Sequence, residues 1–200
     1  MEENLAIIWM SAGNSYFTEE RIKKIFKFAE EKFDKIIILS PDKPAEHNFR
    51  ALGYIEKKIK KKAKLNSNLL LNRAKRKLLE NENKEKFMIE KWENISKNKY
   101  YKEELKILRK LYLKDESFKE DIFELSKKVL NKENKKVNLK EAGLYLIEEL
   151  AFILSSPKIY SMKNSNYLYH KKLDIFDKLV SGKYDKIKRK NIFFIKTNIK

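Results

Sequence analysis

Residues 7–17 constrain the fold of this chain most, because they change from an apolar run to a helix start within a few positions. Residues 5–10 are a continuous apolar run, long enough for one buried strand and too short to span a membrane. Residues 11–15 are small and include a glycine and an asparagine, which favour a tight turn with positive φ. Thr18, followed by two glutamates, is typical of a helix N-terminus.

A parallel strand–helix–strand unit is therefore expected at the start of the chain. Apolar residues recur at helical spacing over 19–33, and a second apolar run over 36–39 predicts a second buried strand. Ser11 then lies at the carboxyl end of the first strand, the edge at which open α/β sheets bind ligands. An ordinary strand-to-helix turn is the alternative interpretation, because serine is common in such turns.

The rest of the chain is predicted to be mostly helical. Helices are expected over 49–79, 100–113, 118–130, 139–154 and 173–179, and strands from about 86 to 89 and over 192–195. Residues 66–68 are a candidate break in the first of these helices, and residues 155–157 are expected to end the fourth. Loops are expected over 41–44, 131–136 and 160–170.

Length and composition narrow the class of protein. The 200 residues suit a single domain over 1–200. The sequence has no cysteine, no apolar run of membrane length and no signal segment at its start, so we expect a cytoplasmic protein that binds no membrane. With two histidines and no cysteine, no metal site is expected.

The charge of the chain points to an anionic partner. The formal net charge is +18, and residues 50–79 hold eleven basic residues and one acidic residue. A helix presents such cations along one line, which suits a nucleic-acid backbone. A solvated lysine face is the alternative. Arg73 and Arg76 lie three residues apart and are the first candidates for phosphate contact, because arginine binds phosphate in a bidentate manner.

Four segments, in order along the chain, resemble the signatures of the cyclodipeptide synthases. They are Ser11-x-Gly-Asn-Ser-Tyr-Phe17, His47-Asn-Phe-Arg-Ala-Leu-Gly-Tyr54, Tyr145-Leu-Ile-Glu-Glu149 and Tyr169-His170. Each is weak alone, but four in the right order are specific. The resemblance implies an α/β, Rossmann-like three-layer sandwich with a central, mainly parallel sheet, similar to the catalytic domain of class I aminoacyl-tRNA synthetases. The ATP-binding motifs of those synthetases are missing from this sequence.

The resemblance also implies a reaction. Two aminoacyl-tRNAs are joined into a cyclodipeptide, a 2,5-diketopiperazine, through an aminoacyl-enzyme and a dipeptidyl-enzyme on Ser11. No ATP, metal or organic cofactor is expected, because the ester bond of the aminoacyl-tRNA carries the free energy. Serine is a weak nucleophile without a base, but transfer from an activated ester depends more on positioning than on strong activation.

Roles for individual residues follow from the same resemblance. Ser11 matches the nucleophile, Asn14 the asparagine that helps hold the substrate backbone, and Tyr169 the tyrosine that positions the intermediate and relays protons. Tyr145 and Glu149 match the pair that binds the aminoacyl ammonium, and Glu149 is also a candidate proton acceptor. Their spacing of four residues favours Glu149 over its neighbour Glu148. The other expected substrate-binding residues are Ile7, Trp9, Gly13, Phe152 and Tyr167, and the expected tRNA-binding residues are Lys61, Lys64, Arg73, Lys75, Arg76 and Lys77.

Trp9 departs from the family pattern, which usually has glycine two residues before the serine. Trp9 and Ser11 are expected to point to the same face of the strand, so the indole would narrow the first aminoacyl pocket. Two other functions remain open on these residues. One is a noncatalytic tRNA- or RNA-binding module of the same fold, and the other is a serine esterase that uses His170. A monomer is expected.

Overall fold

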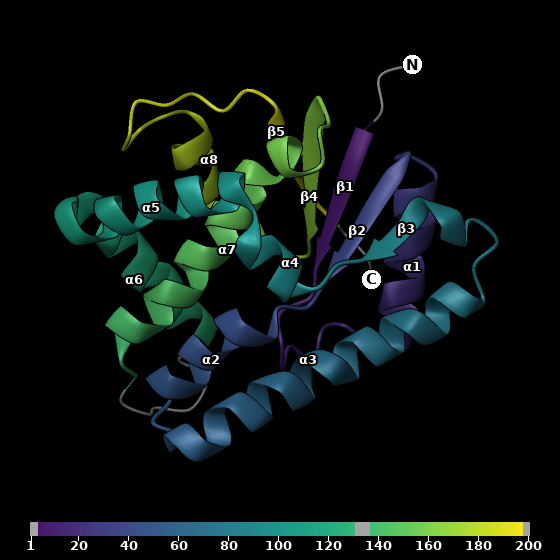
Figure 1. Ribbon diagram of the computed structural model, residues 1–200, viewed down its shortest axis with the longest axis horizontal. Coiled ribbons are helices and arrows are strands. Elements are labelled where there is room, and N and C mark those ends of the chain that lie inside the picture. The colour runs from purple at the N-terminus through teal and green to yellow at the C-terminus, as the bar shows by residue number, and fades with distance from the viewer. Residues whose placement is uncertain (1–3, 131–136, 198–200) are drawn as a thin grey trace.

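A single parallel sheet forms the centre of the computed structural model of the protein, which describes residues 4–130 and 137–197 (Figure 1). Within this part of the chain the strand order is β3-β2-β1-β4-β5, and every neighbouring pair is parallel. The predicted α/β fold with a mainly parallel sheet is therefore confirmed. The strands are β1 (Asn4–Trp9), β2 (Lys35–Leu39), β3 (Phe87–Ile89), β4 (Asn164–Tyr169) and β5 (Ile192–Lys196).

Helices cover both faces of this sheet. Alternate residues of β1 point to opposite sides of the sheet, and the apolar residues on each side are buried in a separate cluster. Ala6 and Ile8 belong to an apolar cluster with residues of α1 and α3, whereas Ile7 and Trp9 belong to a cluster with residues of α4, α5, α6, α7 and α8. The helices are α1 (Glu19–Glu30), α2 (Asp42–Ala51), α3 (Glu56–Leu79), α4 (Trp92–Lys97), α5 (Lys99–Lys114), α6 (Glu116–Leu130), α7 (Leu139–Ile159) and α8 (Asp174–Val180), with a 3₁₀ turn at Lys84–Lys86.

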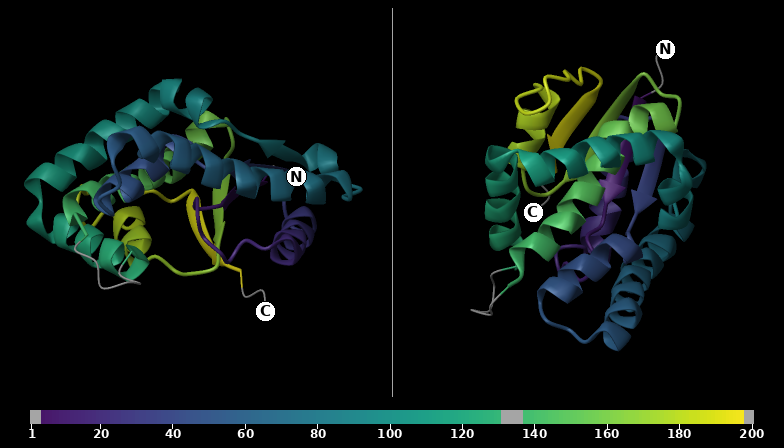
Figure 2. Two further views of the ribbon diagram at one scale, coloured as in Figure 1. Left: turned by 90° about the horizontal axis from the view of Figure 1, so that it is seen from below. Right: turned by 60° about the vertical axis from the view of Figure 1, so that its left-hand side comes forward.

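The order of the strands places a topological switch point between β1 and β4. From β1 the chain proceeds outward through β2 to β3, while β4 and β5 lie on the other side of β1. Ile7 is in register with Tyr167 and Ile8 with Leu168, so both strands end at the same edge. Figures 1 and 2 show α3 running across this carboxyl edge of the sheet. Open α/β folds bind ligands at this position.

The single helix predicted over 49–79 is two helices, and the loop predicted over 41–44 is the start of the first. Pro44 lies in the first turn of α2, where a missing backbone N–H removes no helical hydrogen bond. Gly53, with φ of +78°, turns the chain between α2 and α3. The candidate break at 66–68 is absent, because the buried Ser67 donates its hydroxyl to the carbonyl of Ser40 and α3 continues.

Two further boundaries differ near the C-terminus. The helix expected to end at 155–157 continues to Ile159, because Ser155 and Ser156 donate their hydroxyls to the carbonyls of Ala151 and Ile153, both at 2.7 Å. The loop expected over 160–170 contains β4. Its polar side chains have partners, since the hydroxyls of Ser165 and Ser156 lie 2.7 Å apart.

The first helix and the region after β3 also differ from the predicted elements. The first helix ends at Glu30 rather than at Phe33, and α4 was not expected. The loop predicted over 131–136 lies outside the described residues. In the part of the chain that the structure describes, none of the helices has the length and apolar character that crossing a membrane requires.

Candidate active site

The turn that carries Ser11 follows directly after β1. The backbone N–H of Asn14 donates to the carbonyl of Ser11 at 3.0 Å, and Gly13 has φ of +84°, as the third position of a type II turn requires. A Cβ at Gly13 would lie 3.2 Å from the side-chain nitrogen of Asn66 on α3. Asn14 also accepts the backbone N–H of Tyr16 at 2.9 Å. The turn is therefore fixed from within and fits closely against α3.

Tyr169, the last residue of β4, lies beside the candidate nucleophile. Its hydroxyl is 3.1 Å from the hydroxyl of Ser11, and Asn14 Nδ2 donates to it at 3.4 Å. Burial raises the pKa of Tyr169 to about 12, although its hydrogen bonds with Ser11 and Asn14 oppose the shift. The phenol therefore stays protonated at neutral pH. It can donate a hydrogen bond to Ser11 Oγ once an acyl group has replaced the hydroxyl proton.

Tyr145 and Glu149 lie one turn apart on α7, and they contact the neighbouring strands β1 and β4 through Trp9 and Tyr167. Tyr145 is buried, and its hydroxyl accepts the indole N–H of Trp9 at 2.9 Å. Burial raises the pKa of Tyr145 well above its usual range, and Glu149 adds to the shift while Ser11 and Trp9 counter it. The contribution of Ser11 to the pKa of Tyr145 shows that Tyr145 lies close to the turn that carries Ser11.

Glu149 is the most unusual group of the site, because it is a carboxyl only 3 % exposed. Tyr167 donates its hydroxyl to Glu149 Oε1 at 2.5 Å. Burial raises the pKa of Glu149 to about 7, while the bond from Tyr167 acts in the opposite direction. Among the described residues, Glu149 forms no salt bridge with a lysine, arginine or histidine. A buried carboxylate without a cation is costly, so this position favours a cationic ligand.

Apolar side chains close the site from β1 and α7. Trp9 is fully buried, and its ring centroid lies 5.9 Å from that of Phe152 and 6.0 Å from that of Trp92. Ile7 belongs to the same cluster. Trp9 therefore faces the predicted site, as its position on the strand indicated. Trp92 lies on α4, a helix that the sequence pattern does not predict, and its ring packs edge-to-face with the indole of Trp9. The sequence pattern does not identify Trp92 as part of the site.

Neither histidine completes a serine–histidine pair. The hydroxyl of Ser11 pairs with Tyr169, while the ring of His170 stacks on Tyr16 with centroids 4.0 Å apart. His47 Nδ1 lies 2.7 Å from a carboxylate oxygen of Glu141, at the junction of α2 and α7. The geometry favours a tyrosine rather than a histidine as the group beside the nucleophile.

The six predicted tRNA-binding residues fall into two groups on α3. Lys61, Lys64 and Lys75 are exposed. The other three contact the region around α1. Arg73 donates to the carbonyl of Phe17 at 3.1 Å. Arg76 Nη2 lies 2.6 Å from Glu19.

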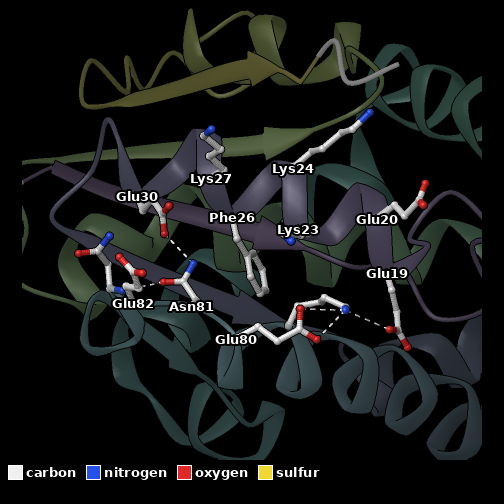
Figure 3. A pocket seen from close by; sticks show the side chains of 12 residues that line it. Glu19, Glu20, Lys23, Lys24, Phe26, Lys27, Glu30, Glu80, Asn81 and Glu82 are labelled. Carbon is white, nitrogen blue, oxygen red and sulfur yellow. Dashed lines mark hydrogen bonds and ion pairs between the residues drawn. The ribbon is translucent and has the colours of Figure 1, made fainter.

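Lys77 shares this carboxylate and lines a groove between α1 and the end of α3. Its ammonium lies 3.4 Å from Glu19 and 2.8 Å from Glu80, two of the glutamates that line the groove in Figure 3. Arg73, Arg76 and Lys77 therefore connect α3 to the region around α1, and part of their hydrogen-bonding capacity is already used. The three exposed lysines are the better candidates for phosphate contact.

The nucleophile turn and α3 enclose a small cleft. It has a volume of about 160 Å³ and is lined by Gly13, Asn14 and Ser15 on one side and by Asn66, Leu69, Leu70 and Arg73 on the other. The basic helix thus reaches the candidate active site itself.

Fold and site together define a Rossmann-like enzyme whose candidate nucleophile is a serine at the switch point of a parallel sheet. The family model for cyclodipeptide synthases matches residues 2–192. The chain therefore belongs to the cyclodipeptide synthase family, and the predicted function, a cyclodipeptide synthase supplied with aminoacyl-tRNAs, is confirmed at the level of the family.

Individual relatives agree with this assignment. Cyclo(L-leucyl-L-leucyl) synthase of Staphylococcus haemolyticus is 22% identical over 201 residues, covering 96% of this chain and 86% of the relative. A solved cyclodipeptide synthase structure from that organism has a TM-score of 0.86 at 20% identity and covers 99% of this chain and 92% of its own.

Two further solved structures have lower TM-scores. A Mycobacterium tuberculosis protein has a TM-score of 0.73 at 21% identity, over 85% of this chain and 74% of its own, and its structure is described as relating cyclodipeptide synthetases to type I tRNA synthetases. A cyclodipeptide synthase from Candidatus Glomeribacter gigasporarum, solved bound to Phe-tRNAPhe, has a TM-score of 0.67 at 14% identity, over 100% of this chain and 89% of its own. Both structures share the predicted fold with this chain.

Proposed function

We propose that this protein joins the aminoacyl groups of two aminoacyl-tRNAs into a cyclodipeptide by a ping-pong route through Ser11. The observation that carries the proposal is the buried carboxyl of Glu149. It is held by Tyr167, lies one turn from Tyr145, and has no cationic partner among the described residues. An aminoacyl group brings the ammonium that this carboxyl needs.

The first transfer places the aminoacyl group on the serine. The Oγ of Ser11 attacks the ester carbonyl of the first aminoacyl-tRNA, the bond to the ribose oxygen breaks, and that oxygen leaves with the proton. Tyr169, 3.1 Å from Ser11 and protonated at neutral pH, donates to the oxygen of the new ester or passes the proton on. Tyr145 and Glu149 hold the ammonium of the transferred residue.

The second transfer uses the amine that these residues hold. Glu149, with its pKa raised to about 7, accepts a proton from the bound ammonium. The free amine attacks the ester carbonyl of the second aminoacyl-tRNA and forms the peptide bond. The ester bond to the ribose oxygen breaks, and the tRNA leaves with the proton of the amine on that oxygen. The amine of the dipeptide then attacks its own ester to Ser11, which closes the ring and restores the serine hydroxyl.

The position of α3 supports tRNA as the carrier. Its exposed lysines form a basic surface, and the cleft of about 160 Å³ joins the helix to the turn of Ser11. A family member of the same fold has been solved bound to Phe-tRNAPhe. We further propose that the enzyme acts as a monomer in the cytoplasm, where charged tRNAs are present.

The proposal is tested by incubating the purified protein with a complete set of charged tRNAs and searching for diketopiperazines by mass spectrometry. A defined cyclodipeptide that requires charged tRNA supports it. Tight binding of tRNA with no product from any charged tRNA would indicate the alternative, a noncatalytic tRNA-binding module.

Trp9→Gly is expected to broaden the first amino acid accepted toward larger side chains, because the fully buried indole occupies volume next to Tyr145 and Phe152. The expected loss of stability is about 3–5 kcal/mol. Product profiles with all charged tRNAs, recorded below the melting temperature of the variant, measure the effect. Trp9→Phe is the matched control, since it removes the hydrogen bond to Tyr145 but keeps most of the volume. An unchanged profile in a folded Trp9→Gly variant would make Trp9 ordinary core packing.

Replacing Lys61 and Lys64 by alanine is expected to weaken tRNA binding and to lower the log–log slope of affinity against salt by about one unit for each phosphate that the protein no longer neutralises. Arg73→Ala with Arg76→Ala is expected to act in the same direction, but it also removes the bonds to Phe17 and Glu19. Binding measured at several salt concentrations separates the two pairs. Glu19→Gln is the control, because it frees Arg76 without removing a cation. Unchanged slopes in both double variants would place the tRNA elsewhere.

A further inference from the structure

A second basic surface lies on α5, separate from the candidate active site. Lys102, Lys106, Lys110 and Lys114 follow one another at intervals of four residues, and all are exposed. Four residues of helix advance about 6 Å, so the four ammonium groups follow one line over about 18 Å. We name these four residues the α5 lysine row.

The row is not explained by a general excess of lysine. α5 carries six basic and two acidic residues, whereas α6, next to it, carries three basic and four acidic ones. α1 has four basic and three acidic residues, and α7 has two and three. The net positive charge of these five helices thus gathers on α5 and α3, and α3 is the helix that the proposed function already assigns to tRNA.

The lysines of the row also differ from other exposed lysines in their pairing. Lys97, Lys119 and Lys127 each form an ion pair with a glutamate three or four residues away. Within the described part of the chain, no residue of the α5 lysine row has such a partner. Like charges four residues apart on a helix destabilise it by a few tenths of a kcal/mol per pair. The arrangement is therefore unfavourable for the free helix and favourable for a bound polyanion.

The surface beside the row is hollowed and includes an arginine. A groove of about 480 Å³ runs along α5 and is lined by the row, Leu105, Arg109 and Leu113. Leu113 is 78% exposed. Arg109 Nη2 lies 3.3 Å from Glu148 of α7, the residue next to Glu149. The groove is thus joined through one ion pair to the helix that carries Tyr145 and Glu149.

We infer that the α5 lysine row binds the phosphate backbone of tRNA during the reaction, as a second contact surface beyond α3. α5 packs on α7, α7 on α2, and α2 on α3, so a continuous series of packed helices connects the two basic helices (Figure 1). A line of mobile cations without base-reading side chains fits a backbone and carries no sequence specificity. The inference rests on the proposed function for the identity of the polyanion.

The test replaces Lys102, Lys106 and Lys110 by glutamine and compares the variant with Lys119, Lys127 and Lys128 replaced in the same way. Both variants lose three positive charges, but only the first loses them from the α5 lysine row, of which Lys114 remains. For the first variant we expect the log–log salt slope of tRNA binding to fall by about two to three units, since each neutralised phosphate contributes about one unit. We expect its KM for aminoacyl-tRNA to rise about tenfold with kcat unchanged, and the α6 variant to show less than half of either effect.

Equal effects in the two variants would overturn the inference, because they would reflect net charge alone. Binding of the row to vesicles of anionic lipid, with tRNA binding unchanged, would also overturn it. Failure of the proposed function is seen separately, as a wild-type protein that makes no cyclodipeptide from any charged tRNA. In that case the salt slopes with uncharged tRNA still decide whether the row binds it.

Discussion

Ser11→Ala is expected to give a folded protein that forms no covalent aminoacyl adduct and no cyclodipeptide. The side chain supplies the only oxygen to which both proposed intermediates are attached, so product should fall by on the order of 10⁴-fold or more. The loss of stability should be small, about 1 kcal/mol, because the serine gives up one hydrogen bond with Tyr169 in a partly buried turn. Product formation, adduct formation and thermal unfolding measure the three expectations.

Ser15→Ala is the matched control for this substitution. Ser15 belongs to the same segment but is exposed. The control variant should keep its activity within a few-fold of the wild type. An aminoacyl adduct that persists on the Ser11→Ala variant would place the nucleophile at another residue.

Glu149→Gln is expected to lose activity by about 10²–10⁴-fold, because glutamine neither balances the ammonium nor accepts its proton. In the wild type, kcat/KM should rise as the pH passes about 7, where the pKa of Glu149 lies and the carboxyl ionises. The variant should lack this rise. A pH–rate profile of both proteins makes the measurement, and an unchanged rise in the variant would assign it to another group.

The same substitution should stabilise the protein at high pH. Burial raises the pKa of Glu149 from 4.5 to about 7, so the native state binds more protons than the unfolded state between these values. Stability therefore falls as the pH rises through this window, and the full cost, about 3 kcal/mol, is present above pH 7. Relative to the wild type, Glu149→Gln should become more stable between pH 5 and pH 8, as urea unfolding at both values would measure. A difference that does not change with pH would contradict a buried, unpaired carboxyl.

The nucleophile turn could be predicted from the sequence because its determinants are local. The apolar run of β1, the glycine that adopts positive φ and the cap at Thr18 all lie within a few residues of one another. The resemblance added Tyr145, Glu149 and Tyr169, which the structure brings to the same side of the sheet as the Ser11 turn. Their chemical roles remain predictions.

Other parts could not be predicted because their causes are interactions between distant segments. The polar sequence of β4 predicts a loop. In the fold, the hydroxyl of Ser165 is hydrogen-bonded to that of Ser156, and Asn166 donates to the carbonyl of Leu5 at 3.1 Å. Similarly, the sequence around Arg76 predicts a free cation on a basic helix, whereas the fold pairs Arg76 with Glu19 of α1. The polar periodicity of a segment does not reveal partners that the fold brings from elsewhere.

The central claim is that Ser11 carries the aminoacyl group between the two tRNAs. Mass spectrometry of the intact wild-type protein, quenched in acid after mixing with one species of aminoacyl-tRNA, tests it most directly. The account predicts a mass increase equal to one aminoacyl residue, located by proteolysis on the peptide that contains Ser11, and its conversion to cyclodipeptide when a second aminoacyl-tRNA is added. A cyclodipeptide formed without any adduct on that peptide would contradict the account.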